Sequence, residues 1–303
     1  MYFFAKPAFR RFFAAAAVLS VSCAAWAQSG YSPPLWEVRS EQNTVYLFGT
    51  IHVGKADFYP LPPAVESAFA NSEVLALEVD PANEQEALVA FMSAMYAPPD
   101  SIENHLTPAL LASVVEISAR YGVPFEQLRQ MKPYLLMLTL TTLEYARLGY
   151  SATQGLESHF SQRARNSGKR VVSLESMSQQ MQMLENLSPQ LQSAMLQITV
   201  DELANDEVSE LVTKMIQAWR AGDTAALDAV LSVEERRLPG AMAKEFHERF
   251  LTERNVEMAQ QVERMLRNGE RAFVAVGALH MAGKQGLPAL LSAKGYKVRA
   301  LRD

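Results

Sequence analysis

The chain contains 303 residues, of which 49% are hydrophobic and 20% are charged, and its formal net charge is −5. A chain of this length and composition can bury a sizeable core, which excludes a wholly disordered protein. The negative net charge and the lack of a basic tract argue against binding to nucleic acid. We therefore expect a globular protein with no nucleic-acid partner.

The N-terminus has the three parts of a secretory signal peptide. Positive charges at Lys6, Arg10 and Arg11 precede an apolar run, and Ala25-Trp26-Ala27 provides a cleavage site of the A-x-A type. The apolar run is too short for a comfortable transmembrane span. We therefore predict that residues 1–27 are a signal peptide and that the mature protein is periplasmic or secreted, with no stable membrane span after cleavage.

The only cysteine, Cys23, lies inside this segment. A lipoprotein would carry its lipid on this residue, but Ser20 stands where the lipoprotein signal prefers leucine. Anchoring through Cys23 is therefore the alternative to release as a free protein. After cleavage at the predicted site the mature chain has no cysteine, so neither a disulfide nor a thiolate nucleophile is available to it.

Residues 28–303 are predicted to form one α/β domain around a central mixed sheet. Apolar runs at 35–38 and 44–48, separated by polar residues, indicate a hairpin. The stretch from about 82 to 250 is mostly helical, and we expect it to be inserted between core strands and to form a cap. Further strands are expected at 74–80, 169–175, 271–276 and 296–301, and helices include 63–70, 109–120, 125–148 with a break or kink at Pro133, 244–267 and 285–294.

Two strands of the predicted sheet end in the same motif, Gly-x-x-His. Tyr46-Leu47-Phe48 leads into Gly49-Thr50-Ile51-His52, and Val274-Ala275-Val276 leads into Gly277-Ala278-Leu279-His280. Glycine at a strand end permits close approach of another group, and neutral imidazole is the commonest metal ligand among side chains. The repeated pattern predicts one centre that is assembled from both ends of the fold.

Two other predicted strands end in carboxylates, Glu78 with Asp80 on one and Glu175 on the other. If these strands run parallel to those of His52 and His280, all four carboxyl ends lie along one edge of the sheet, where open α/β folds bind ligands. Two imidazoles and a carboxylate suit a divalent transition metal that keeps a position free for water. Such a metal would support hydrolysis without a protein nucleophile.

The same residues also have structural explanations. A histidine at a strand end is often structural, and Glu78 or Glu175 would suit the N-terminus of a following helix. Arg254 and Asn255 fit either a solvated helix face or a buried pair that orients a carboxylate. The histidines without a glycine partner are expected to be structural: His105, His159 and His247.

Taken together, the motifs resemble the TraB/GumN family. The resemblance rests on the two Gly-x-x-His segments, on Ala76-Leu77-Glu78-Val79-Asp80, on Gly155-Leu156-Glu157, and on Arg254-Asn255 before the last core strand. It extends over about residues 35 to 301, with one minor departure at Met281, where leucine is common.

This family resemblance implies a fold shared with the Tiki proteases and with erythromycin-esterase-like and ChaN-like proteins. By analogy with Tiki, it implies a metal-dependent peptidase in which His52, Glu78 and His280 hold manganese, cobalt or zinc. Glu78 is then also a candidate general base, and Arg254 and Asn255 are further catalytic candidates. Additional candidate ligands are Asp80, Glu157 and Glu175.

Two functions remain open from the sequence. The first is an exported metal-dependent hydrolase, most simply a peptidase, with a peptide or small-molecule substrate. The second is a non-catalytic periplasmic protein that binds a haem-like or other small molecule at the same edge, as the ChaN-like relatives suggest. Metal content combined with turnover would separate the two.

Overall fold

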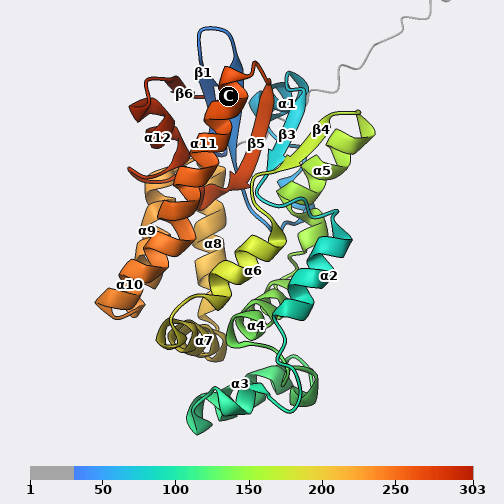
Figure 1. Ribbon diagram of the computed structural model, residues 1–303, viewed down its shortest axis with the longest axis vertical. Helices are drawn as coiled ribbons and strands as arrows, with labels where there is room; N and C mark the ends of the chain where they lie inside the picture. Colours follow the sequence, from blue (N-terminus) through green and yellow to red (C-terminus); the bar gives the residue numbers. More distant parts are fainter. Residues whose placement is uncertain (1–30, 303) are drawn as a thin grey trace, which may run out of the picture.

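The computed structural model describes residues 31–302, which form a six-stranded sheet surrounded by helices (Figure 1). The predicted signal peptide and Cys23 lie outside the described residues. Within residues 31–302, no helix is both long enough and apolar enough to cross a bilayer.

The sheet is mixed, as the sequence predicts. Its strands are β1 (Leu35–Arg39), β2 (Thr44–Thr50), β3 (Val74–Leu77), β4 (Arg170–Ser173), β5 (Ala272–Gly277) and β6 (Lys297–Ala300), in the spatial order β4-β3-β5-β2-β1-β6. The four strands β4, β3, β5 and β2 run parallel to one another, whereas β1 pairs antiparallel with both β2 and β6. The predicted hairpin of β1 and β2 is confirmed, and the four parallel strands end at one edge.

Helices cover both faces of the sheet and create two separate cores. Adjacent strand residues point to opposite faces, so Phe48 and Leu47 belong to different cores. On one side Phe48 packs with Phe160, at a ring-centroid distance of 5.7 Å. On the other side Leu47 belongs to the core that contains Met258 and Leu291. The helices that cover these faces are α1 (Pro63–Ala70) and α5 (Leu156–Asn166), and, opposite them, α11 (Glu253–Arg267) and α12 (Leu287–Ala293).

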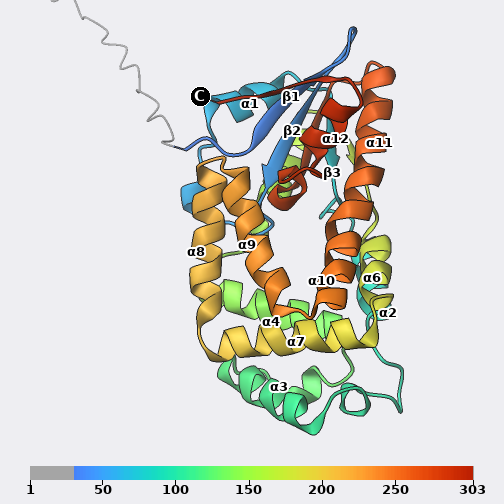
Figure 2. The same ribbon diagram turned by 90° about the vertical axis from the view of Figure 1, so that its left-hand side faces the viewer.

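The remaining helices form a cap beyond the carboxyl ends of the parallel strands, which confirms the predicted helical cap (Figure 2). A buried tryptophan attaches the cap to the sheet. Trp219 donates a hydrogen bond through its indole nitrogen to the carbonyl of Gly49 at 2.8 Å, and it stacks on Phe58 at 5.1 Å. The cap helices are α2 (Glu84–Ser93), α3 (Pro108–Arg120), α4 (Pro133–Arg147), α6 (Met177–Glu185), α7 (Pro189–Ala204), α8 (Glu207–Arg220), α9 (Thr224–Arg237) and α10 (Gly240–His247).

Proline and capping residues set the limits of several cap helices. The helix expected over 125–148 is divided, because only a 3₁₀ turn forms at Phe125–Gln127 and α4 begins at Pro133. Proline suits the first turn of a helix, where its missing N–H group would have no partner. Thr107 accepts a hydrogen bond from the amide of Leu110 and caps α3.

The helix predicted over 244–267 is observed in three joined parts. A π-helical segment, Glu248–Thr252, lies between α10 and α11. Such segments change the direction in which the following side chains point and are frequent at functional sites. Arg254 and Asn255 come shortly after this segment, on the first turn of α11.

Candidate functional site

The strand ends selected from the sequence meet at one edge of the sheet. Because β2, β5, β3 and β4 are parallel neighbours, the residues that follow them are brought together. His52 follows β2, and His280 lies in the 3₁₀ turn Ala278–Met281 that follows β5. Glu78 directly follows β3, and Glu175 comes just after β4.

Glu78 is buried at the centre of this edge, and its two carboxylate oxygens have different partners. Oε1 accepts a hydrogen bond from the amide of Gly277 at 2.5 Å and lies 3.4 Å from Nε2 of His280. Oε2 accepts from Nη2 of Arg254 at 2.9 Å. Burial by itself would raise the pKa of Glu78, but the charges of His280, His52 and Arg254 and the Gly277 amide lower it to about 2. The carboxylate is therefore ionised at neutral pH.

His280 is held by the amide side chain of Asn255. Nδ2 of Asn255 donates to the carbonyl of Gln285 at 2.8 Å, so its Oδ1 is the atom that faces Nδ1 of His280, at 2.6 Å. Nδ1 must then carry the ring hydrogen. Burial lowers the pKa of His280 to about 4, so at neutral pH its Nε2 is an acceptor that faces another acceptor on Glu78. A cation or a hydrogen-bond donor between these two atoms would relieve their repulsion.

His52 is oriented by a carboxylate in the same way. Its Nδ1 donates to Oε1 of Glu157 at 2.8 Å, and the hydroxyl of Thr50 donates to the same oxygen. The charge of Glu157 raises the pKa of His52, although the side chain of His52 is 67% exposed and water screens part of the attraction. A carboxylate behind an imidazole fixes the ring tautomer and leaves Nε2 directed at the site, which is a common arrangement behind metal ligands.

Two glycines allow Glu157 to reach His52. A Cβ atom on Gly155 would lie 2.1 Å from the carbonyl oxygen of His52, and one on Gly54 would lie 2.1 Å from the carbonyl oxygen of Gln154. Any side chain at either position would separate the loop after β2 from the start of α5. The Gly-Leu-Glu segment is therefore needed for the position of His52.

Gly277 marks the point at which the two histidines and Glu78 converge. A Cβ atom added to Gly277 would lie 3.1 Å from Oε1 of Glu78, 3.4 Å from Nε2 of His52 and 3.6 Å from the ring of His280. Glu78, His52 and His280 thus surround a space that would be filled by the Cβ atom of any residue other than glycine at position 277. The first glycine of the second Gly-x-x-His motif both keeps this space free and donates its amide to Glu78.

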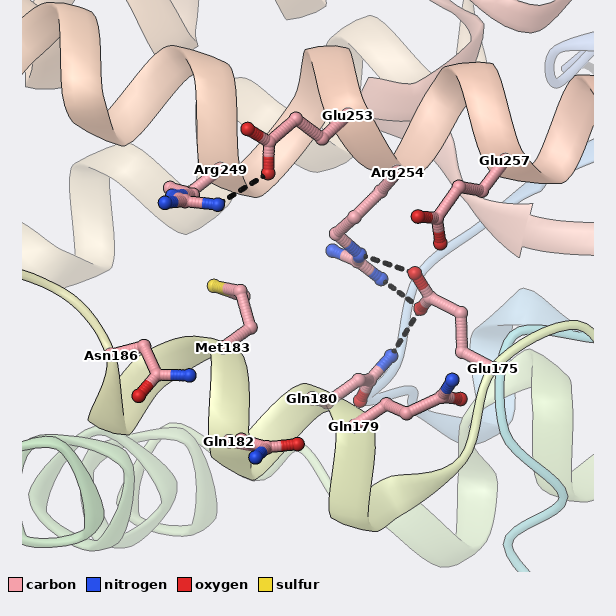
Figure 3. Close-up of a pocket in the computed structure, with 10 residues that line it drawn as sticks. All are labelled: Glu175, Gln179, Gln180, Gln182, Met183, Asn186, Arg249, Glu253, Arg254 and Glu257. Atoms are coloured by element: carbon pink, nitrogen blue, oxygen red, sulfur yellow. Dashed lines mark hydrogen bonds and ion pairs between the residues drawn. The ribbon is translucent and has the colours of Figure 1, made fainter.

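Arg254 joins the two carboxylates of the site. Its guanidinium donates to both oxygens of Glu175, at 2.8 and 2.7 Å (Figure 3). It also donates to Glu78, at 2.9 Å. Gln180 donates to the same carboxylate of Glu175 at 2.9 Å. Burial alone would lower the pKa of Arg254, but the hydrogen bonds and charges of the two carboxylates raise it. Arg254 therefore neutralises part of the negative charge and fixes the orientation of Glu78.

Two pockets have Arg254 in their lining. A polar groove of about 430 Å³ lies between α6 and α11 (Figure 3). A second cavity, of about 270 Å³, lies between the strand edge and the cap and contains His52, Glu78 and His280 in its lining. Its other walls are mainly apolar and are given by Val212, Met215, Ile216, Leu227, Leu231, Phe246 and Phe250.

The candidate ligands do not form a closed metal cage. Within residues 31–302, no group of three or more His, Cys, Asp or Glu side chains is spaced to hold a metal ion. His52, Glu78 and His280 converge, but one oxygen of Glu78 is bound to Arg254. Asp80, a further candidate, lies apart from them, because its carboxylate pairs with Arg165 and accepts from Ser161 on α5.

The other histidines of the described chain have local partners. His105 stacks on Tyr96 and hydrogen-bonds to Asp100, and His247 hydrogen-bonds to Glu235. His159 packs on the ring of Tyr59 and accepts from Arg163. These contacts agree with the structural roles expected for His105, His159 and His247.

Two residues that support the site were not selected from the sequence. Thr50 supports Glu157, and Gln180 supports Glu175. Gly277 was expected to permit the close approach of another group, but the hydrogen bond from its amide to Glu78 was not predicted. Thr50 lies inside a Gly-x-x-His segment, so its proximity to His52 was a usable signal. Gln180 lies on a helix without any motif, and only the folded chain reveals its contact.

Comparison with known proteins gives a family but no experimentally characterised relative. Residues 34–300 match the model described as the TraB/PrgY/gumN family. The chain is 24% identical over 246 residues to the uncharacterized protein YbaP of Escherichia coli strain K12, which covers 81% of this chain and 87% of YbaP. The YbaP protein of Shigella flexneri matches to the same extent. No solved structure matches the chain significantly.

Proposed function

The chain belongs to the TraB/PrgY/gumN family, and on that premise we propose that it is an exported metal-dependent hydrolase that acts on peptides. The observation that carries the proposal is the convergence of His52, His280 and Glu78 around Gly277. His52 and His280 come from opposite ends of the chain, and each has its Nδ1 atom engaged by a separate partner. Nε2 of His280 lies 3.4 Å from Oε1 of Glu78, and Nε2 of His52 would lie 3.4 Å from a Cβ atom added to Gly277, which that oxygen also adjoins.

The donor types at this point suit a divalent cation, although in this structure the three side chains are not spaced to hold one. Two imidazole nitrogens and one carboxylate oxygen suit manganese, cobalt or zinc, and Glu157 and Asn255 provide the outer support that such histidines usually have. A bound metal would supply Lewis-acid activation of water and of a carbonyl group. His52 and His280 would be its ligands, with Glu78 as a third ligand or as the base.

The chain's own residues would then prepare and complete the cleavage of an amide bond. Glu78 is ionised at neutral pH and can accept a proton from the attacking water. Hydrolysis adds the hydroxyl group to the carbonyl carbon, breaks the C–N bond and transfers the proton to the leaving amine. Arg254 holds Glu78 in place and Asn255 holds His280, so both act by positioning.

The apolar walls of the cavity support a second function, the binding of a small molecule without catalysis. Known small-molecule sites span about 300–1,000 Å³. The cavity of about 270 Å³ is therefore small for a haem-like group and fits a smaller apolar ligand better. This alternative predicts ligand retention without turnover.

The test compares metal content and turnover in histidine variants. The mature protein is loaded separately with Mn²⁺, Co²⁺ and Zn²⁺, its metal is measured by elemental analysis, and a peptide library is digested. His52→Ala and His280→Ala should each lose a ligand and most activity, and the double variant should be little worse than either, because the ligands act as a unit. His105→Ala is the matched control, since His105 lies in a separate cluster with Tyr96.

Glu78→Gln separates the two roles of the carboxylate. Loss of metal in this variant would identify a ligand, whereas retained metal with lost turnover would identify a base. Wild-type metal content and hydrolysis in both single histidine variants would refute the metal-centre proposal. The non-catalytic alternative would then be the better account.

A further inference from the structure

We propose that the cavity above the strand edge is a specificity pocket for one uncharged apolar side chain of the substrate, of leucine or phenylalanine size. The inference rests on the proposed function, because it places the scissile bond at His52, Glu78 and His280. The inference specifies the chemical class of the substrate side chain and the cavity residues that would select this side chain. No sequence motif indicated this pocket.

The cavity is polar at one end and apolar elsewhere. All of its ionisable groups apart from Tyr145 lie at the strand edge and α11: His52, Glu78, Arg254 and His280. The cap supplies the other walls with apolar side chains at helical spacing, such as Val212 and Ile216 of α8. A substrate must therefore place its polar reacting group at the strand edge and its side chain against the cap.

The walls would disfavour a charged side chain. A charge moved from water into an apolar wall loses its hydration, and this loss is offset only by a partner charge or hydrogen bonds. The charged groups at the cavity end are already engaged, since Arg254 pairs with Glu78 and Glu175, and His52 pairs with Glu157. The one polar side-chain group that the cap contributes to the lining is the hydroxyl of Tyr145, which burial keeps uncharged by raising its pKa. An acidic or basic substrate side chain would therefore find no partner charge among the cap residues that line the cavity.

The size of the cavity sets the size of the side chain. An apolar cavity of about 150 Å³ in another protein is large enough to hold benzene. The cavity here, of about 270 Å³, can therefore hold an aromatic or branched aliphatic side chain together with part of the adjoining main chain. Phe246 and Phe250, whose ring centroids lie 4.3 Å apart, add aromatic surface to the lining.

The wall residue to change is Ile216, which is buried on α8 and faces the cavity. Ile216→Phe should fill part of the space and move the preference from phenylalanine to alanine by about tenfold or more, since one methylene in an apolar pocket changes selectivity by roughly 10- to 200-fold. Ile216→Ala should move the preference in the opposite direction. Gln217→Phe, on the exposed side of the same helix, is the matched control and should leave the preference unchanged.

The assay measures relative kcat/KM for a metal-loaded enzyme and peptides that differ only by Leu, Phe, Ala, Asp or Lys next to the cleaved bond. The wild-type protein should favour Leu and Phe over Asp and Lys by at least about tenfold. Equal rates for charged and apolar residues, or selectivity in Ile216→Phe and Ile216→Ala equal to that of the wild type, would refute the pocket.

A binding experiment keeps this test separate from that of the hydrolase. The ¹⁹F line width of N-acetyl-4-fluorophenylalanine amide should increase with the wild-type protein and with Gln217→Phe, and should narrow again on addition of N-acetyl-leucine amide but not of N-acetyl-aspartic acid amide. The broadening should be lost in Ile216→Phe. Specific broadening without hydrolysis by any metal form would refute the hydrolase and retain the pocket, whereas unchanged broadening in Ile216→Phe would refute the pocket itself.

Discussion

The substitution Gly277→Ala tests the geometry of the site with a single methyl group. Gly277 has ordinary backbone angles, φ −48° and ψ 137°, so alanine is not excluded by conformation. The added Cβ would lie 3.1 Å from Oε1 of Glu78 and 3.4 Å from Nε2 of His52. The contact with Glu78 is tighter than usual, so its carboxylate must move by a few tenths of an ångström, whereas the contact with His52 is at the edge of ordinary van der Waals distance.

The expected magnitude follows from this crowding. Inserting a methyl group into a packed site costs about 1–3 kcal/mol, and we expect the lower half of that range because the contacted atoms belong to side chains. The amide of Gly277 also donates to Oε1 of Glu78, so displacement of the carboxylate weakens that bond. Because changes to groups that orient a metal ligand typically lower metal affinity about 10- to 100-fold, we expect a loss in this range.

Urea denaturation followed by circular dichroism measures the stability, and calorimetric titration with Mn²⁺, Co²⁺ or Zn²⁺ measures the affinity. The matched control is Gly240→Ala at the start of α10, where nothing lies within 4 Å of an added Cβ. The control should be neutral or slightly stabilising. If Gly277→Ala matches the wild type in both measurements, then Glu78 and His52 do not lie against Gly277 and the described site is wrong.

Three further expectations concern other parts of the chain. Leu184→Ala should lower the free energy of unfolding by about 2–5 kcal/mol, because Leu184 is only 5% exposed, whereas Leu88→Ala, at a residue 62% exposed, should change it by less than about 0.5 kcal/mol in the same urea titration. Burial lowers the pKa of His159 to about 4, so the unfolded chain binds more protons than the folded chain between about pH 4 and 6.5, and stability should fall as pH falls through this window. The stability difference between wild type and His159→Gln should change with pH inside this window and be constant above it. Mass spectrometry of the exported protein should find an N-terminus at or near Gln28; an intact N-terminus on a cytoplasmic protein would contradict export, and an acylated Cys23 would support the lipoprotein alternative.

The position of the site was predictable because residues that follow parallel strands lie at the same edge of the sheet. His52 and His280 each follow a buried apolar run after a Gly-x-x step, and Glu78 and Glu175 end two others. Parallel strands bring their carboxyl ends to one edge, so local patterns were enough to place these four residues near one another. Buried strands can be recognised from the pattern of neighbouring apolar residues, which a single sequence shows directly.

The helix boundaries were predicted less well, for an equally local reason. Pro133 disfavours the turn before it and suits the first turn after it, and the sequence alone did not decide between a kink and a new helix. The π-helical segment at Glu248–Thr252 left no recognisable signal. It depends on how α10 and α11 pack, because the same residues would also fit a regular helix.

The sequence by itself determined the α/β class, the mixed sheet, the helical cap and the four strand ends that carry the site, since each follows from hydrophobic period, turn residues or repeated motifs. Only the tertiary structure decided which groups support which. Glu157 reaches His52 across 105 positions of the chain, and Arg254 reaches Glu78 across 176. The tertiary structure also decided that Asp80 hydrogen-bonds to Ser161 on α5 and that α8 and α9 contribute to an apolar cavity. Contacts between distant segments depend on the packing of whole elements, and local sequence patterns do not contain that information.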